Sequence, residues 1–123
     1  MIGIDITSIS RIVHLCNRFG TETVANRFLS ELELAQPITM KLIASRWAAK
    51  EAISKAIGTG ISSHCQLKEI SILNDTNGKP YVTFIGATGE YVSGKTFHIS
   101  ISHEEEYAVA VCISIPNALN HYL

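Results

Sequence analysis

The sequence has little that would place the protein in a membrane or outside the cell. No stretch is apolar over the length needed to span a bilayer, and residues 1–5 lack the basic flank and long apolar segment of a signal peptide. Three cysteines are an odd number, are widely spaced and form no CxxC pair, which does not suit a disulfide framework. We therefore expect reduced thiols in a cytoplasmic protein that has no membrane partner.

A strong charge of either sign is also missing. Ten Lys and Arg residues against 11 Asp and Glu residues give a formal net charge of -1. This balance argues against nucleic acid as a partner, so an acidic partner must be met by a local basic patch. The chain also lacks G-x-x-x-x-G-K-[ST], G-x-S-x-G, H-E-x-x-H and the dinucleotide fingerprint. A covalent hydrolase is therefore poorly supported.

What is present is the pattern of one compact α+β domain. The chain has 123 residues, 46% of them hydrophobic, with no internal repeat or linker, so residues 1–123 are assigned to a single domain. N-terminal helices packed on a small antiparallel sheet, which the first strand joins, are the predicted architecture. The periodicity predicts helices over 8–19, 21–29 and 39–57, and strands over 2–6, 67–73, 81–85, 97–102 and 108–115.

The helix from Thr39 carries the clearest chemical signal. On a helical wheel its alanines share one half, while Arg46, Lys50, Glu51 and Lys55 spread over the other. One interpretation is an ordinary solvated face with a Glu51–Lys55 pair. The other is a phosphate site, because fixed Arg and Lys donors hold phosphate oxygens and a carboxylate holds a hard cation. Helical geometry does not separate the two.

Asp5 lies in a short strand in which Ile2, Ile4 and Ile6 occupy the opposite face. An acid there is unfavourable unless it is at an edge, is paired or binds something. Asp5 and Glu51 together offer the oxygen ligands that magnesium prefers alongside phosphates and waters.

Three further features suit either a structural or a binding role. His98 and His103 fall on opposite faces of a continuous strand, which argues against a two-histidine zinc site and leaves the strand-end His103 exposed. The turn 77–80 is a hairpin whose amides and lysine could also contact an anion. Arg11, His14 and Arg18 share one exposed helical stripe.

These pieces occur in an order that resembles the short, single-domain holo-acyl-carrier-protein synthases of the 4′-phosphopantetheinyl transferase superfamily. The resemblance rests on Gly3-Ile4-Asp5-Ile6, on the block from Arg46 to Ala56, on Gly58-Thr59-Gly60, on Asn77-Gly78-Lys79-Pro80 and on Ser100-Ile101-Ser102-His103. The Trp-Ala-x-Lys-Glu-x-x-x-Lys-Ala block is the specific part. The matches run nearly from end to end of the chain.

The resemblance implies a transferase that moves 4′-phosphopantetheine from coenzyme A to a serine hydroxyl of apo acyl carrier protein and releases adenosine 3′,5′-bisphosphate. It assigns Asp5 and Glu51 as ligands of Mg²⁺, with Mn²⁺ as a possible substitute. Glu51 also helps to activate the serine, and Lys55 lies near the pyrophosphate. These three residues are the expected catalytic group.

Other positions acquire binding roles from the same resemblance. Arg46 and His103 match groups that hold the 3′-phosphate of coenzyme A. Arg11 and Arg18 match the helix that receives the acidic recognition helix of acyl carrier protein. The residues expected to line the nucleotide site at the hairpin are Asn77, Gly78, Lys79 and Pro80.

The resemblance further implies a homotrimer with the coenzyme A site between adjacent subunits. In one respect the chain departs from the family, whose members often carry extra cations just before the main helix. Residues 37–41 supply only Lys41, which leaves the clamp on the 3′-phosphate weaker or differently arranged.

Two alternatives remain open from the residues alone. The first is a different metal-dependent phosphate-transfer or hydrolysis enzyme that uses Asp5 and Glu51 and turns over without a carrier protein. The second is a non-catalytic module that binds an acidic helix through Arg11, His14 and Arg18, for which Glu51→Gln would leave partner binding intact.

Overall fold

The structure is a computed structural model that describes residues 1–120, so the last three residues of the predicted domain 1–123 lie outside it. Its domain limits stay a prediction. The elements, in chain order, are β1 Ile2–Ser8, α1 Ile9–Phe19, α2 Thr21–Phe28, α3 Glu31–Leu34, α4 Met40–Ile57, the short 3-10 helix η1 Leu67–Glu69, β2 Ile70–Asn74, β3 Pro80–Phe84, α5 Gly86–Tyr91, β4 Lys95–His103, β5 Tyr107–Pro116 and α6 Asn117–Asn120.

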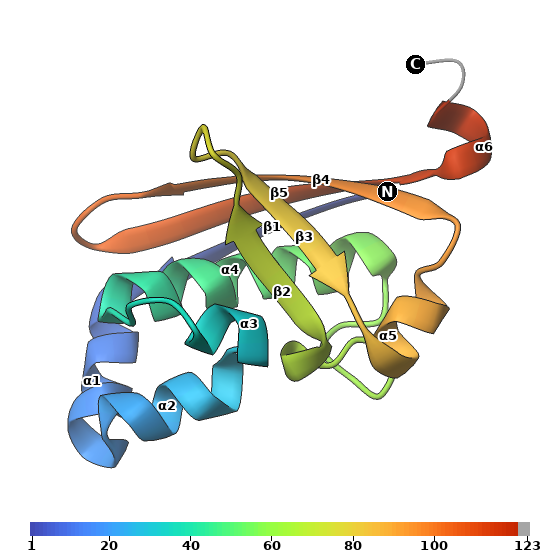
Figure 1. The fold of residues 1–123 in the computed structure, drawn as a ribbon. Coiled ribbons are helices and arrows are strands. Elements are labelled where there is room, and N and C mark those ends of the chain that lie inside the picture. Colours follow the sequence, from blue (N-terminus) through green and yellow to red (C-terminus); the bar gives the residue numbers. More distant parts are fainter. Residues whose placement is uncertain (121–123) are drawn as a thin grey trace.

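The predicted α+β class is confirmed, but the strands form two sheets rather than one. β1, β5 and β4 form a three-stranded antiparallel sheet in that order, and β2 pairs only with β3. The first strand joins the larger sheet, as expected, through its pairing with β5. Figure 1 shows α4 along one face of the larger sheet, with α1–α3 gathered at one end of the molecule and α5 at the other.

Local signals explain where the helices begin and end. Ser8 and Thr39 cap α1 and α4 through their side-chain oxygens, and Ser30 and Glu33 form a reciprocal capping box on α3. Gly58 ends α4 with a φ of 96°, a left-handed conformation that favours glycine. The predicted helix boundaries are therefore confirmed to within about two residues.

Three local predictions need correction. The strand predicted over 67–73 begins only at Ile70, because Leu67–Glu69 turn as a 3-10 helix. The three-four spacing of Ile9, Ile12, Cys16 and Phe19 predicts that all four are buried on one stripe of the first helix, but Phe19 is exposed at the helix end. The short helix α5 was not predicted, because the carboxylate that accepts from its amides belongs to the distant Glu69.

β1 approaches α4 very closely at Gly3. A Cβ atom built on Gly3 would lie 2.0 Å from the carbonyl oxygen of Ala52, so only glycine fits there. The α4 residues Ala48, Ala52 and Ala56 are fully buried and supply the small surface that this approach needs. The contact brings the next inward-facing residue of β1, Asp5, beside the helix.

The opposite face of β1 is apolar and exposed. Ile2, Ile4 and Ile6 are 68%, 62% and 63% exposed, whereas Gly3 and Thr7 are buried. On β5 the same outer face carries Val109, Val111 and Ile113, which pair directly with the isoleucines. A contiguous exposed aliphatic patch of this kind marks an interaction surface more often than ordinary solvent-facing sheet.

Candidate active site

Asp5, Glu51 and Lys55 form a charged cluster where β1 meets α4. The Lys55 ammonium lies 3.1 Å from Asp5 Oδ1 and donates to the carbonyl oxygen of Ile4 at 3.0 Å. Thr7 donates from its hydroxyl to Asp5 Oδ2 at 3.0 Å. The predicted catalytic residues are therefore neighbours, although Asp5 and Lys55 are 50 positions apart.

The electrostatics of Glu51 fit a group poised for protonation or metal binding. Partial burial raises the pKa of Glu51 above its ordinary value, and the nearby Asp5 carboxylate raises this pKa further. Lys55 opposes both effects by favouring the charged carboxylate. A cation placed between the two acids would relieve this repulsion.

The donor set fits a magnesium ion that shares its coordination with substrate. Among residues 1–120 no group of three or more His, Cys, Asp and Glu side chains is arranged as a metal-binding cluster. Two carboxylates alone are too few to saturate the ion, but Mg²⁺ usually binds one or two carboxylates and takes its other oxygens from phosphates and water. Asp5 and Glu51 therefore suit a metal that arrives with a phosphate ligand.

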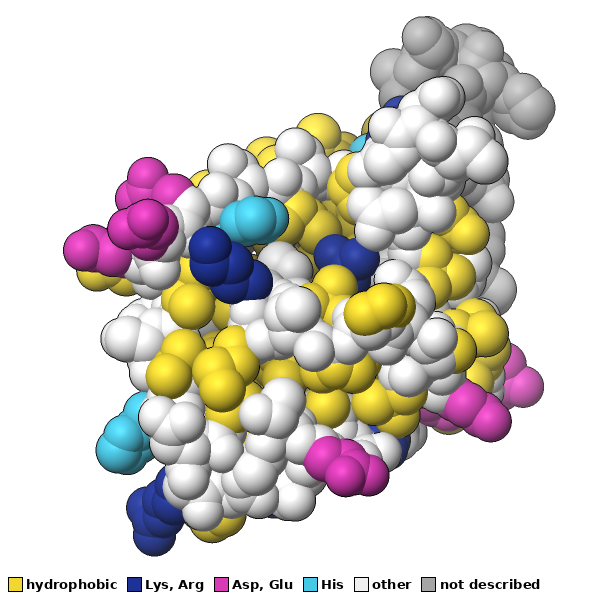
Figure 2. Space-filling model, turned by 60° about the vertical axis from the view of Figure 1, so that its left-hand side comes forward, with side chains coloured by type: hydrophobic (Ala, Val, Ile, Leu, Met, Phe, Trp, Pro, Cys, Tyr) yellow, Lys and Arg dark blue, Asp and Glu magenta, His cyan; other side chains and the backbone are white. Residues whose placement is uncertain are grey.

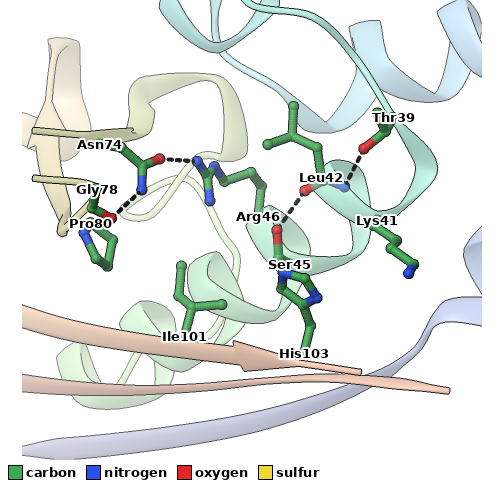
Figure 3. Close-up of a pocket in the computed structure, with 10 residues that line it drawn as sticks. All are labelled: Thr39, Lys41, Leu42, Ser45, Arg46, Asn74, Gly78, Pro80, Ile101 and His103. Atoms are coloured by element: carbon green, nitrogen blue, oxygen red, sulfur yellow. Dashed lines mark hydrogen bonds between the residues drawn. The ribbon is translucent and has the colours of Figure 1, made fainter. Parts of the chain in front are cut away.

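A cavity of about 520 Å³ opens on the same helix, nearer its N-terminal end (Figure 3). It brings together the predicted phosphate ligands Arg46 and His103 with two of the four hairpin residues. The lining residues are Thr39, Lys41, Leu42, Ser45, Arg46, Asn74, Gly78, Pro80, Ile101 and His103.

Arg46 is the buried cation of this cavity. The residue is only 6% exposed, and its Nη2 donates to Asn74 Oδ1 at 2.8 Å. Burial lowers the pKa of Arg46, while the Glu33 carboxylate nearby raises it. The guanidinium keeps further N–H donors in a fork suited to phosphate oxygens.

The hairpin contributes less than the sequence suggested. Gly78 and Pro80 line the cavity, whereas Asn77 and Lys79 are exposed and do not. The backbone amides of Asn77 and Lys79 donate to Asp75 Oδ1. The expectation that these amides contact an anion is corrected, because Asp75 already uses them to close the turn.

The two histidines separate as predicted. His98 pairs with Ile113 on the outer face of the sheet, whereas His103 pairs with the buried Ala108. His103 therefore shares the inner face with Asp5 and reaches the cavity. Lys41, the one cation of residues 37–41, also lines the cavity, so the cationic lining is Arg46 and Lys41 beside a histidine.

Lys50 does not belong to the exposed charged face on which the wheel placed it. Its ammonium is fully buried and donates to the Glu33 carboxylate and to the carbonyl oxygens of Phe28 and Leu67. Glu33 also accepts from the amide of Ile72. Lys50 thus ties α4 to α3 and to the start of the β2–β3 hairpin instead of serving the site.

Arg11, His14 and Arg18 are all exposed on α1, as the stripe predicted. The Arg18 guanidinium lies 5.0 Å from the centre of the Phe19 ring, a cation–π arrangement. On the face drawn in Figure 2, Lys and Arg side chains lie apart from one another among broad hydrophobic areas.

Sequence reasoning missed Asn74, whose side chain joins Arg46 to the hairpin. Asn74 ends β2, and a single Asn at a strand end is an ordinary turn signal. Its contact with Arg46 spans 28 positions, so no local pattern could have revealed it.

None of the helices within residues 1–120 has the length and apolarity to traverse a bilayer.

Fold and site together define an α+β domain with paired carboxylates beside a lysine and a cationic cavity nearer the start of the same helix, a set of groups that suits a phosphate-bearing ligand. The model of the 4′-phosphopantetheinyl transferase superfamily matches residues 1–112. The chain belongs to this superfamily, and it is a transferase.

Relatives of known name cover almost the whole chain. It is 46% identical over 113 residues to the holo-[acyl-carrier-protein] synthase of Nautilia profundicola, with 92% of this chain and 97% of that protein aligned. The corresponding protein of Campylobacter curvus is 45% identical over 113 residues, covering 92% and 98%.

Solved structures agree with the fold. The Helicobacter pylori holo-[acyl-carrier-protein] synthase in complex with coenzyme A superposes with a TM-score of 0.82 at 35% identity, covering 93% of this chain and 99% of that one. The Neisseria meningitidis synthase gives a TM-score of 0.84 at 33% identity, covering 92% and 95%.

Proposed function

We propose that this chain is a holo-acyl-carrier-protein synthase that transfers 4′-phosphopantetheine from coenzyme A to a serine hydroxyl of apo acyl carrier protein. Membership of the superfamily and the names of the full-length relatives support this reaction. The same membership favours a transferase over both alternatives left open by the residues, the carrier-independent phosphate enzyme and the non-catalytic binding module.

The observation that carries the proposal is the convergence of Asp5, Glu51 and Lys55. The serine oxygen attacks the phosphorus on the pantetheine side of the pyrophosphate and forms a new P–O ester bond. The P–O bond to the bridging oxygen breaks, and adenosine 3′,5′-bisphosphate leaves. A phosphate centre accumulates negative charge during this exchange, so opposing cations at fixed positions are what the site must supply.

Each residue of the cluster has a distinct role in the proposal. Asp5 and Glu51 would hold Mg²⁺, or Mn²⁺, and the bound ion supplies a Lewis acid that stabilises charge on the phosphate oxygens. Lys55 presents its ammonium toward the same oxygens from its contact with Asp5. Glu51, whose pKa is raised by burial, accepts the serine proton directly or through a water.

The cavity around Arg46 is the proposed nucleotide end. Arg46 and His103 hold the 3′-phosphate, and Lys41 adds a second cation from the segment that is otherwise poor in them. Gly78 and Pro80 form one wall, while Asn77 and Lys79 remain predicted ligands at the exposed turn. Arg11 and Arg18 form the proposed docking stripe for the acidic helix of the carrier protein.

We also propose that the chain assembles as a homotrimer through the exposed face of β1 and β5. Burying Ile2, Ile4 and Ile6 in the assembly would remove a large apolar surface from water, at about 25 cal/mol per Å². Sedimentation equilibrium tests this assembly, since three times the monomer mass is expected and a monomer mass would overturn it.

The three cysteines are free and buried, which accords with the predicted cytoplasmic location.

The test of function is intact-mass analysis of apo acyl carrier protein incubated with the protein, coenzyme A and magnesium. A mass gain of one phosphopantetheine, absent when the metal is chelated, is expected. No gain with several carrier proteins, from a folded sample that binds coenzyme A, would reject the proposed reaction. Phosphate release without any carrier would instead support the carrier-independent alternative.

A further inference from the structure

Asn74 connects the guanidinium of Arg46 to the hairpin turn through both ends of its side-chain amide. Its Oδ1 accepts from Arg46 Nη2 at 2.8 Å, and its Nδ2 donates to the carbonyl oxygen of Gly78 at 2.8 Å (Figure 3). The two partners fix the orientation of the amide, because an arginine only donates and a carbonyl only accepts. Asn74 thus has one orientation that satisfies both contacts.

Arg46 has a second, competing acceptor on its other side. The Glu33 Oε2 atom lies 4.0 Å from Arg46 Nε, and this buried Nε has no hydrogen-bond partner among the described residues. Glu33 is 1% exposed and already paired with Lys50, yet its carboxylate still favours the charged guanidinium of Arg46 across this distance. The hydrogen bond to Asn74 opposes that attraction and keeps the Nη atoms on the cavity side.

We propose that Asn74 is a positioning residue that gives the site its selectivity for a 3′-phosphorylated nucleotide by holding Arg46 toward the cavity and away from Glu33. The proposal rests on the assignment of the nucleotide to this cavity in the proposed function. Removing Asn74 would let the guanidinium move toward Glu33, so the 3′-phosphate would lose a properly oriented bidentate donor. A nucleotide without that phosphate would lose little.

Asn74 is well placed for a clean test, because it is exposed and its replacement creates no core cavity. The probes are adenosine 3′,5′-bisphosphate and adenosine 5′-monophosphate, titrated by calorimetry into the whole protein. For Asn74→Ala we expect roughly a tenfold weaker affinity for the bisphosphate, the usual scale for one hydrogen bond to a charged group. Affinity for the monophosphate should change by less than about twofold. Thr76→Ala, an exposed residue of the same turn, is the matched control and should leave both affinities unchanged.

A double-mutant cycle separates positioning of Arg46 from simple tethering of the hairpin. In an Arg46→Met background, Asn74→Ala should cause no further loss of selectivity, because the two residues act as one unit. Equal losses for both nucleotides, or losses that add in the double variant, would overturn the proposal and leave Asn74 as a hairpin tether. If Arg46→Met does not fold, the ratio of the two affinities in Asn74→Ala decides alone.

Measuring the rate of phosphopantetheine transfer by the wild type separates the test of Asn74 from the test of the proposed function. A wild type that transfers no phosphopantetheine, while Asn74→Ala still loses selectivity for the bisphosphate, rejects the reaction and supports the positioning role. If the wild type transfers phosphopantetheine and Asn74→Ala keeps its selectivity, the reaction is supported and the positioning role of Asn74 is rejected.

Discussion

Helix α4 makes two carboxylate–lysine contacts that differ in almost every physical respect. Lys50 and Glu33 pair with side chains 0% and 1% exposed, whereas Lys55 and Asp5 pair with side chains 51% and 15% exposed. The two lysines are five positions apart, about 140° around the helix. One therefore points toward α3 and the hairpin, and the other toward β1.

The two pairs differ in how completely their charged groups are hydrogen-bonded and neutralised. Lys50 uses its three donors on Glu33, Phe28 and Leu67, and Glu33 accepts from two backbone amides besides. Nothing is left over to bind a ligand. At Asp5 the partners are a half-exposed lysine and one hydroxyl, with the partly buried carboxylate of Glu51 beside them. Burial and saturation thus mark the structural pair, and incomplete neutralisation marks the candidate catalytic group.

The largest expected effect is on the structural pair. Lys50→Met leaves the buried Glu33 carboxylate without the cation that is hydrogen-bonded to it, and the free energy of unfolding should fall by about 3–5 kcal/mol. Urea denaturation monitored by circular dichroism measures this. Combining Lys50→Met with Glu33→Gln should recover part of the loss, since the uncompensated charge is then gone. A Lys50→Met variant as stable as the wild type would contradict the distinction between the two pairs.

The second effect is on metal binding at the open cluster. Glu51→Gln should weaken Mg²⁺ binding, measured by calorimetry with adenosine 3′,5′-bisphosphate present, by at least roughly a hundredfold, because an anionic ligand is replaced by a neutral one. Its thermal midpoint should not fall. Glu22→Gln, an exposed acid on α2, is the control and should bind as the wild type does. Unchanged binding in Glu51→Gln would remove this residue from the metal site.

A smaller effect is expected when the exposed lysine is removed. Lys55→Met should lower the free energy of unfolding by no more than about 1 kcal/mol, because a half-exposed ion pair is screened by water. It should still reduce the rate of transfer by roughly tenfold or more, because a cation next to the reacting phosphate is lost. Comparing its urea midpoint with that of Lys50→Met contrasts the two lysines directly. A loss of stability as large as that of Lys50→Met would show that exposure does not separate them.

The smallest effect concerns pH. Because the folded state raises the pKa of Glu51, the native protein binds more protons there than the unfolded chain, and stability falls as pH rises from the ordinary to the raised pKa. Glu51→Gln removes this cost. Its melting temperature should therefore match or exceed that of the wild type at pH 8, with the advantage vanishing as pH falls below the ordinary range of a glutamate. An advantage that grows at low pH would have the wrong sign.

How much the sequence predicts depends on whether the signal is local. The caps at Ser8 and Thr39 and the stop at Gly58 lie next to the helices that they bound, so the first helix and α4 could be located. The alternation of β1 located Asp5 on one face, but periodicity does not say which face meets the helix. The close approach that decides it occurs between Gly3 and Ala52, far apart in the chain.

The same limit explains the error at Lys50. A helical wheel treats one half of a helix as core and the other as surface, whereas α4 packs against the larger sheet and also against α1, α2 and β2. The fully buried Lys50 is stabilised by partners from three other segments. The role of Asn74 could not be predicted for a related reason, because it depends on a contact with Arg46, which is distant in the chain. The separation of the strands into two sheets also depends on pairing that strand patterns do not encode.

The central claim is that Asp5, Glu51 and Lys55 form the catalytic cluster, and the rate of phosphopantetheine transfer by Glu51→Gln tests it most directly. The rate would be followed by intact mass of the carrier protein, at matched concentrations of folded enzyme and with saturating coenzyme A and magnesium. The account predicts that transfer falls by at least roughly a hundredfold while the thermal midpoint is retained. A Glu51→Gln enzyme that transfers at the wild-type rate would contradict the account.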